Sequence, residues 1–334
     1  MNAVRLDDRR GLVRFGVGAA LLSCSVLAGA QTMGDPTGWL TRIHQAAINR
    51  SYQGTMAFSA GGHVSSSRVV HIADGRERYE RIEVLDGPRR QQFRHNGSML
   101  TLMPETKVAV VEQVETRAEF PALPASSQRA VDSYEVRTIG TDRVADHEAE
   151  VLLLKPRDSL RYAQRLWAER DSGLLLRTEV LGPRGEVLES SAFIHLVIGG
   201  KLAPDVVLKP MKRKLDGYRI VRPQTISTQL DAEGWSVKTL PAGFHLVSCS
   251  KRPLDAASEA STDMPVLQSV FSDGLTHVSV FAERFDAQRH KPMRTMLGAT
   301  NTLMNRHGDW WITIVGDVPM ATIQQFEAML QRRP

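Results

Sequence analysis

The stretch from Tyr79 to Glu115 is the feature that most constrains how this 334-residue chain folds. It contains short runs of mixed polar and apolar residues, separated by Asp86-Gly87-Pro88, by Asn96-Gly97 and by Pro104-Glu105-Thr106. Asn-Gly between two extended runs is a strong hairpin signal, because both central residues of a type I′ turn need a positive φ. The stretch therefore predicts an antiparallel meander, and we expect it to form part of an open, curved sheet that binds a ligand.

Alternation of apolar and charged residues continues on both sides of the meander. It predicts about ten strands between Ser51 and Ile198, each with one face on a core and one face on water. Residues 38–50 have the apolar spacing of a helix with one buried face, and residues 126–134 predict a shorter helix. We expect these helices to cover the sheet.

A second, smaller domain follows a Pro- and Lys-rich stretch of weak periodicity, residues 201–224, which we interpret as a solvated linker. The strands expected after it are 266–271, 276–283, 295–305 and 310–315, and a helix is expected over 319–331. Strands followed by one helix, without βαβ alternation, indicate an α+β fold with antiparallel sheets.

Residues 1–30 have the order of a secretory signal peptide. Four arginines, the last of them Arg14, precede a short apolar run over residues 15–27, and Ala28-Gly29-Ala30 is a small-x-small cleavage site. The apolar run is shorter than the roughly 20 residues that a membrane anchor needs. We therefore expect Sec-dependent export and cleavage after Ala30.

Removal of that segment leaves Cys249 as the sole cysteine, because Cys24 lies within it. Cys249 stands in an alternating run with no basic group beside it, so we expect a buried strand thiol rather than a nucleophile. The formal charge falls from +5 to +3, since the segment carries four arginines and two aspartates. A charge this small does not predict nucleic-acid binding, and it suits an acidic peptide or an anionic lipid surface equally well.

Motifs of catalysis and metal binding are absent from the sequence. It has no G-x-S-x-G elbow, no H-E-x-x-H, no P-loop and no G-x-G-x-x-G motif. The ten histidines do not pair with one another or with cysteine at metal-ligand spacing. We therefore predict a protein that is not an enzyme, with no cofactor and no metal site.

Six arginines flank the first turn of the meander and are the candidate ligand-binding residues. They are Arg76, Arg78, Arg81, Arg89, Arg90 and Arg94. A tight turn at residues 86–88 would place them on neighbouring strands, where guanidinium groups can pair with carboxylate or phosphate in a bidentate way. The alternative, which we favour for any single arginine, is a solvated strand face neutralised by Glu77, Glu80 and Glu83.

Short motifs spread over nearly the whole chain resemble the RseB/MucB family, and they appear in family order. They are Asp86-Gly87-Pro88-Arg89-Arg90, Asn96-Gly97, residues 140–145, Leu240-Pro241-Ala242-Gly243-Phe244, Ser272-Asp273-Gly274-Leu275 and residues 312–319. Three more, Leu166-Trp167, Ser172-Gly173-Leu174 and Arg184-Gly185-Glu186, resemble the lipoprotein-carrier sheet of the LolA type.

The resemblance implies a large, LolA-like half-open β-barrel with covering helices over residues 31–200. A linker (201–224) and a smaller antiparallel-sheet domain with a C-terminal helix (225–334) would follow. It also implies a periplasmic regulator of an envelope-stress sigma factor of the sigma-E or AlgU type. Such a protein binds the periplasmic region of a transmembrane RseA/MucA-type anti-sigma factor and shields it from site-1 proteolysis, and lipid or lipopolysaccharide would release the complex.

Two other functions stay open at this stage. One is a periplasmic lipoprotein or lipid carrier of the LolA type, which would not need the domain after Gln224. The other is a secreted hydrolase, whose active site would have to assemble from distant residues. The sequence also leaves open which lipid is sensed, which residues form the interface and whether the chain forms a homo-oligomer.

Overall fold

The computed structural model of the chain describes residues 36–113, 120–252 and 265–333. The chain divides into two compact units, residues 1–33 and 34–334, and the described residues all belong to the second. The expected signal peptide with Cys24, and its cleavage site after Ala30, lie outside the described residues. No helix within the described ranges is both long and apolar enough to cross a membrane.

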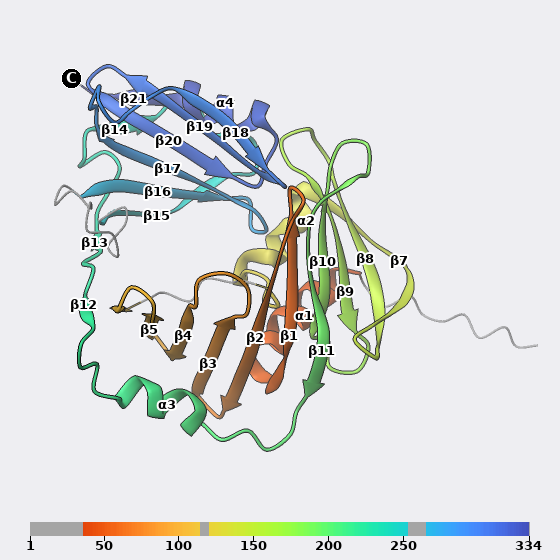
Figure 1. The fold of residues 1–334 in the computed structure, drawn as a ribbon. Helices are drawn as coiled ribbons and strands as arrows, with labels where there is room; N and C mark the ends of the chain where they lie inside the picture. The colour runs from red at the N-terminus through yellow and green to blue at the C-terminus, as the bar shows by residue number, and fades with distance from the viewer. Residues whose placement is uncertain (1–35, 114–119, 253–264, 334) are drawn as a thin grey trace, which may run out of the picture. The chain divides into compact units, whose positions relative to one another are not determined.

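Twelve strands of the described residues form one open sheet, in the order β12-β6-β5-β4-β3-β2-β1-β11-β10-β9-β8-β7 (Figure 1). Every pair is antiparallel except the parallel pair of β12 with β6. The strands are β1 (Tyr52–Ala60), β2 (His63–Asp74), β3 (Glu77–Val84), β4 (Gln91–His95), β5 (Ser98–Met103), β6 (Val108–Gln113), β7 (Tyr134–Val144), β8 (His147–Pro156), β9 (Ala163–Glu169), β10 (Leu175–Leu181), β11 (Val187–Ile198) and β12 (Arg219–Val221).

The meander predicted from the sequence is confirmed within this sheet. Strands β3, β4, β5 and β6 pair with their neighbours in chain order and in antiparallel register. Asn96 takes a φ of 52° in the two-residue turn between β4 and β5, as the Asn-Gly signal indicated. Side chains of these strands alternate between two faces, so that Phe93 and Leu100 are buried on the same face.

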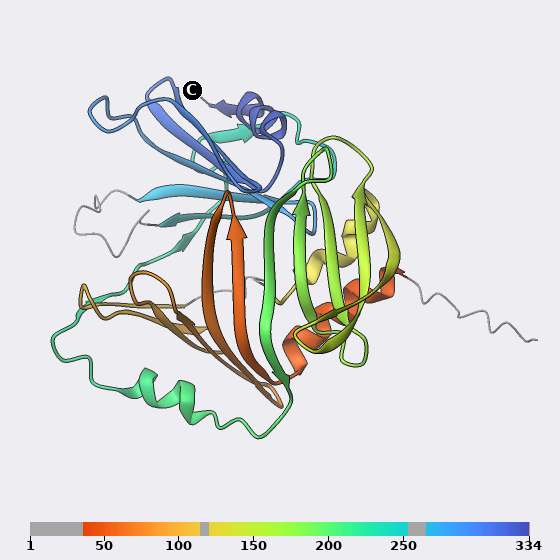
Figure 2. The same ribbon diagram turned by 45° about the vertical axis from the view of Figure 1, so that its right-hand side comes forward.

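Helices cover both faces of the 12-stranded sheet (Figure 2). They are α1 (Pro36–Asn49), the 3₁₀ helix η1 (Ala125–Arg129), α2 (Ala130–Ser133) and α3 (Asp205–Lys212). Leu40 and Ile43 of α1 are fully buried against leucines of β8, β9 and β10, which confirms the predicted apolar face of this helix. The short helix predicted after it is present as η1 and α2, and Ala130 joins the same core.

The segment expected to be a solvated linker, residues 201–224, contains α3 and β12. Val207 and Met211 stand four residues apart, on one side of α3, and join the core around Phe93. Pro210 masks this helical pattern in the sequence, but it lies near the C-terminal end of α3. The basic residues 212–214 are exposed. The proposed division of the chain into domains at this segment stays a prediction.

Seven strands of the described residues form a second antiparallel sheet, in the order β13-β15-β16-β17-β20-β19-β18. They are β13 (Ile226–Ser227), β15 (His245–Arg252), β16 (Val266–Ser272), β17 (His277–Arg284), β18 (Met293–Leu297), β19 (Thr300–His307) and β20 (Trp310–Gly316). A separate pair joins β14 (Trp235–Val237) to β21 (Leu330–Arg332). The architecture is therefore mostly antiparallel sheet with few helices, as the α+β prediction requires.

The helix predicted at the end of the chain is present as α4 (Met320–Met329), with Ile323 and Phe326 fully buried in the core of this second sheet. The prediction of a single strand over residues 295–305 is wrong. Gly298 takes a φ of 60° and turns the chain, so that the run forms two paired strands, β18 and β19.

Candidate functional site

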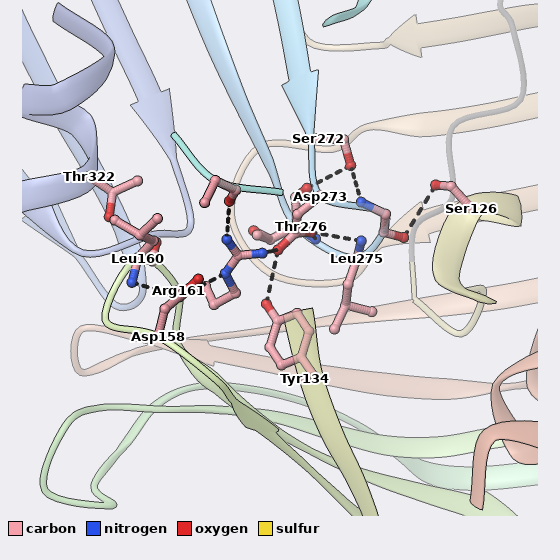
Figure 3. Close-up of polar contacts among 12 residues, drawn as sticks. Ser126, Tyr134, Asp158, Leu160, Arg161, Ser272, Asp273, Leu275, Thr276 and Thr322 are labelled. Carbon is pink, nitrogen blue, oxygen red and sulfur yellow. Dashed lines mark hydrogen bonds and ion pairs between the residues drawn. The ribbon is translucent and has the colours of Figure 1, made fainter. Parts of the chain in front are cut away.

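A buried arginine, Arg161, lies at the centre of the polar contacts that connect the two sheets (Figure 3). Its Nη1 donates to Oδ2 of Asp273 at 2.8 Å, and its Nε donates to Oδ1 of Asp158 at 3.1 Å. Its Nη2 donates to the carbonyl oxygen of Ala242 at 2.5 Å. All three nitrogens of the guanidinium group therefore have acceptors, from three separate segments of the chain.

Asp273 lies in the turn between β16 and β17, and its side chain is as fully buried as that of Arg161. Its Oδ1 accepts hydrogen bonds from the backbone N–H groups of Leu275 at 2.9 Å and Thr276 at 2.8 Å. The hydroxyl group of Tyr134 donates to Oδ2 at 3.3 Å. Burial, and then the charge of Asp273, raise the pKa of Tyr134 well above its usual value, so this hydroxyl keeps its proton and can donate.

Two glycines let the backbone come close around this ion pair. Gly274 has a φ of 100°, and a Cβ atom there would lie 2.7 Å from the carbonyl oxygen of Ser126. Gly243 has a φ of 81°, and a Cβ atom there would lie 2.6 Å from the hydroxyl oxygen of Ser133. A side chain at either position would both strain the backbone and push the two sheets apart.

The pairing of Arg161 with Asp273 is not among the contacts that the sequence predicts. The two residues are 112 positions apart and lie on segments joined to different sheets, so no local pattern connects them. The available signal was the pair of motifs at residues 240–244 and 272–275, which were noted only as resemblances. In the structure both motifs contact Arg161, through the Ala242 carbonyl group and the Asp273 carboxylate.

The six arginines predicted to bind a ligand lie in three places rather than in one cluster. Three are exposed in the turns that flank β3: Arg76, Arg89 and Arg90. Arg81 lies on the face of β3 that α3 covers, with its guanidinium carbon 5.7 Å from the centre of the Phe93 ring. Its Nη2 donates to Oε2 of Glu83 at 3.2 Å, so the alternative interpretation, neutralisation by a neighbouring glutamate, describes Arg81.

Arg78 and Arg94 share the opposite face of the same strands. Glu80 of β3 pairs with His71 on one side and with Arg94 on the other, so these residues lie on one face. Burial lowers the pKa of His71, the hydrogen bond with the Arg50 carbonyl group opposes this, and the positive charges of Arg78 and Arg94 lower it further. The alternation along β1 places Phe58 on the same face, where 40% of its surface is exposed. This face therefore combines two cations with an accessible aromatic ring.

In the described part of the chain, the groups to consider for chemistry are clusters of metal ligands and the thiol of Cys249. No cluster of three or more His, Cys, Asp or Glu side chains there could hold a metal ion. Cys249 is buried in β15 and accepts a hydrogen bond from the Ser269 hydroxyl group at 3.4 Å. Burial raises the pKa of its thiol, which confirms the predicted strand thiol, because a protonated thiol is a poor nucleophile.

The chain matches two protein-family models and is similar to several curated proteins. Residues 35–211 match the MucB/RseB N-terminal domain, and residues 229–331 match the MucB/RseB C-terminal domain. The sigma factor AlgU regulatory protein MucB of Pseudomonas aeruginosa is 29% identical over 317 residues, which is 91% of this chain and 93% of that protein. The sigma-E factor regulatory protein RseB of Salmonella typhimurium is 25% identical over 318 residues, which is 94% of this chain and 96% of that protein.

Two solved structures are similar to nearly the whole chain. The crystal structure of MucB in complex with MucA(peri) has a TM-score of 0.69 and 26% identity, and the match covers 90% of this chain and 100% of that one. The structure of the Pseudomonas aeruginosa MucA/MucB complex has a TM-score of 0.68 and 27% identity, covering 90% and 99% of the two chains.

Proposed function

Because this chain belongs to the MucB/RseB family, we propose that it is a periplasmic negative regulator of an envelope-stress sigma factor. It binds the periplasmic region of a transmembrane anti-sigma factor and thereby shields that region from site-1 proteolysis. The observation that carries this proposal is the likeness, over 90% of the chain, to MucB in complex with MucA(peri). In this account the protein acts by steric exclusion of a protease and catalyses no reaction.

The domain organisation is part of this proposal. Residues 31–200, which carry β1 to β11, would form a LolA-like half-open barrel. Residues 201–224, with α3 and β12, would link it to residues 225–334, the smaller domain that takes most of the anti-sigma contact. The buried ion pair of Arg161 and Asp273 supports a fixed arrangement of the two sheets, because neither charge can lose its partner without a large cost. A partner that touches both sheets would then meet a preformed surface.

Release of the anti-sigma factor by lipid or lipopolysaccharide is the regulatory half of the proposal. It is supported by the face that carries Arg78, Arg94 and Phe58, since guanidinium groups suit lipid phosphates and an apolar face suits acyl chains. Lipid can release the partner only if it binds the free protein more tightly than the complex. Arg76, Arg89 and Arg90 would contribute through the exposed turns, and Arg81, on the opposite face, would contribute only by giving up its pairing with Glu83.

Titration calorimetry with the periplasmic segment of the anti-sigma factor tests the proposal directly. The mature chain should bind this segment with a dissociation constant of about 1 μM or lower, which corresponds to about −8 kcal/mol. Prior addition of lipopolysaccharide should weaken the binding, and a scrambled segment of the same composition should give no heat. Absence of binding at micromolar concentrations would contradict the proposal.

The second candidate function is a periplasmic lipid carrier of the LolA type, which the open sheet and the exposed ring of Phe58 favour. A carrier transfers bound lipid to acceptor vesicles whether or not an anti-sigma segment is present. Mass spectrometry of co-purified lipid, followed by a transfer assay, distinguishes the two functions. Transfer of lipid without any binding of the anti-sigma segment would favour the carrier.

A further inference from the structure

The turn between β18 and β19 rests on the end of the 12-stranded sheet (Figures 1 and 2). A Cβ atom on Gly298 of this turn would lie 2.7 Å from Cβ of Ala60 and 3.0 Å from the carbonyl oxygen of Leu188. A Cβ atom on Gly61 would in turn lie 2.6 Å from Cδ1 of Leu297. A side chain on Gly298 would therefore force the β1 and β11 ends to shift, whereas the atom in the way at Gly61 is the end of the Leu297 side chain.

Two carboxyl groups, one from each sheet, converge on this turn. Glu189 of β11 accepts a hydrogen bond from the backbone N–H group of Ala299. Asp317, which directly follows β20, accepts a hydrogen bond on Oδ1 from the Thr300 hydroxyl group at 2.5 Å. Its backbone carbonyl group accepts a second from the Thr276 hydroxyl group at 3.3 Å, so Asp317 is held in place from both sides.

The other titratable groups near the turn do not supply a positive charge to Glu189. The Tyr162 hydroxyl group lies near Asp317 and Glu186 and accepts a hydrogen bond from Nδ2 of Asn301 at 3.1 Å. His63 lies opposite Ala60 at the start of β2 and is exposed. In the described part of the chain, the charge that acts on Glu189 is the negative charge of Asp317. Ionisation of Glu189 therefore brings two like charges together in a partly dry contact.

Burial raises the pKa of Glu189 from 4.5 to about 7, and the charge of Asp317 adds to this rise while the Ala299 N–H group opposes it. When the turn is detached, Glu189 would titrate near its ordinary value. Protonation therefore favours the attached turn. The contact is strongest below about pH 4.5, weakens as the pH rises from there to about 7, and then stays constant.

We propose that the β18–β19 turn is a proton-controlled latch between the two sheets, closed by the neutral carboxyl group of Glu189 and loosened when that group ionises beside Asp317. The latch would let the acidity of the medium change how firmly the two sheets hold together, whatever partner the protein binds. It differs from the contact at Arg161, where opposite charges neutralise each other.

Hydrogen exchange of the full mature chain, followed by mass spectrometry from pH 5 to pH 8, tests the latch. As the pH rises from 5 to 8, the protection factors of the backbone amides of residues 296–300 should fall in the wild-type protein by at least about tenfold more than in E189Q. This size is expected because one pKa unit corresponds to a tenfold change in an equilibrium constant. Comparison with E189Q at each pH cancels the intrinsic pH dependence of exchange. The matched control E148Q, at a carboxylate with 63% of its side-chain surface exposed, should behave like the wild type.

Equal pH dependence of protection in wild type and E189Q would overturn the latch. A second measurement does not depend on any variant folding correctly. The carboxyl carbon of Glu189 in the wild-type protein should titrate by NMR with a midpoint near 7. A midpoint near 4.5 would show that the turn leaves Glu189 in water, which would also overturn the proposal.

Discussion

At the scale of single residues, the ion pair of Arg161 and Asp273 is the contact most sensitive to change. Its two side chains are fully buried, and every guanidinium nitrogen and both carboxylate oxygens have hydrogen-bond partners. If one of the two charges is removed, the other stays buried away from water without its counter-charge. Asp158 would remain beside Arg161, but a third of its own side-chain surface is exposed.

Substitution D273N should lower the free energy of unfolding by about 3 kcal/mol, because the Arg161 charge would stay buried without its main counter-charge. Urea denaturation of the mature chain measures this change. The control is R143Q, which removes the exposed ion pair of Arg143 with Asp146 and should cost less than about 1 kcal/mol. Equal effects of the two substitutions would contradict the structural role assigned to Asp273.

At the scale of elements, the sequence predicted well wherever local periodicity decided the structure. The apolar spacing of residues 38–50 predicted α1, and the Asn-Gly signal predicted the turn between β4 and β5. Prediction from the sequence was wrong or incomplete where a single residue interrupted a longer pattern. Gly298 divides one expected strand into two, and Pro210 conceals the short helix α3. The first error arises because Gly298 has a positive φ and reverses the chain, and the second because packing of Val207 on distant strands, rather than the local pattern, stabilises α3.

The faces of β3 and β4 give a prediction about lipid binding. The double substitution R78Q/R94Q should weaken binding to anionic vesicles about thirtyfold, because each basic side chain near an anionic lipid surface contributes about 1 kcal/mol. The matched change R89Q/R90Q removes the same charge from exposed turn residues and should have a smaller effect. Vesicle co-sedimentation measures both variants. A larger loss for the turn pair would place the lipid contact outside this face.

At the scale of the whole molecule, the sequence indicated the family and the antiparallel architecture but not the contacts between the sheets. Motif order along the chain is sufficient for a family resemblance, and two family models now match residues 35–211 and 229–331. The ion pair of Arg161 with Asp273 and the contact of Glu189 with Ala299 each connect residues more than 100 positions apart in the sequence. The six arginines were grouped by sequence distance, whereas strand alternation distributes those on β3 and β4 over two faces.

The central claim is that binding shields the anti-sigma factor from its first protease, and a cleavage assay tests this most directly. The purified periplasmic segment is incubated with the site-1 protease and increasing amounts of the mature chain, and intact segment is measured over time. The proposal predicts that cleavage slows in proportion to the fraction of segment bound, and that lipopolysaccharide restores it. An unchanged cleavage rate at saturating concentrations of the chain would contradict the claim.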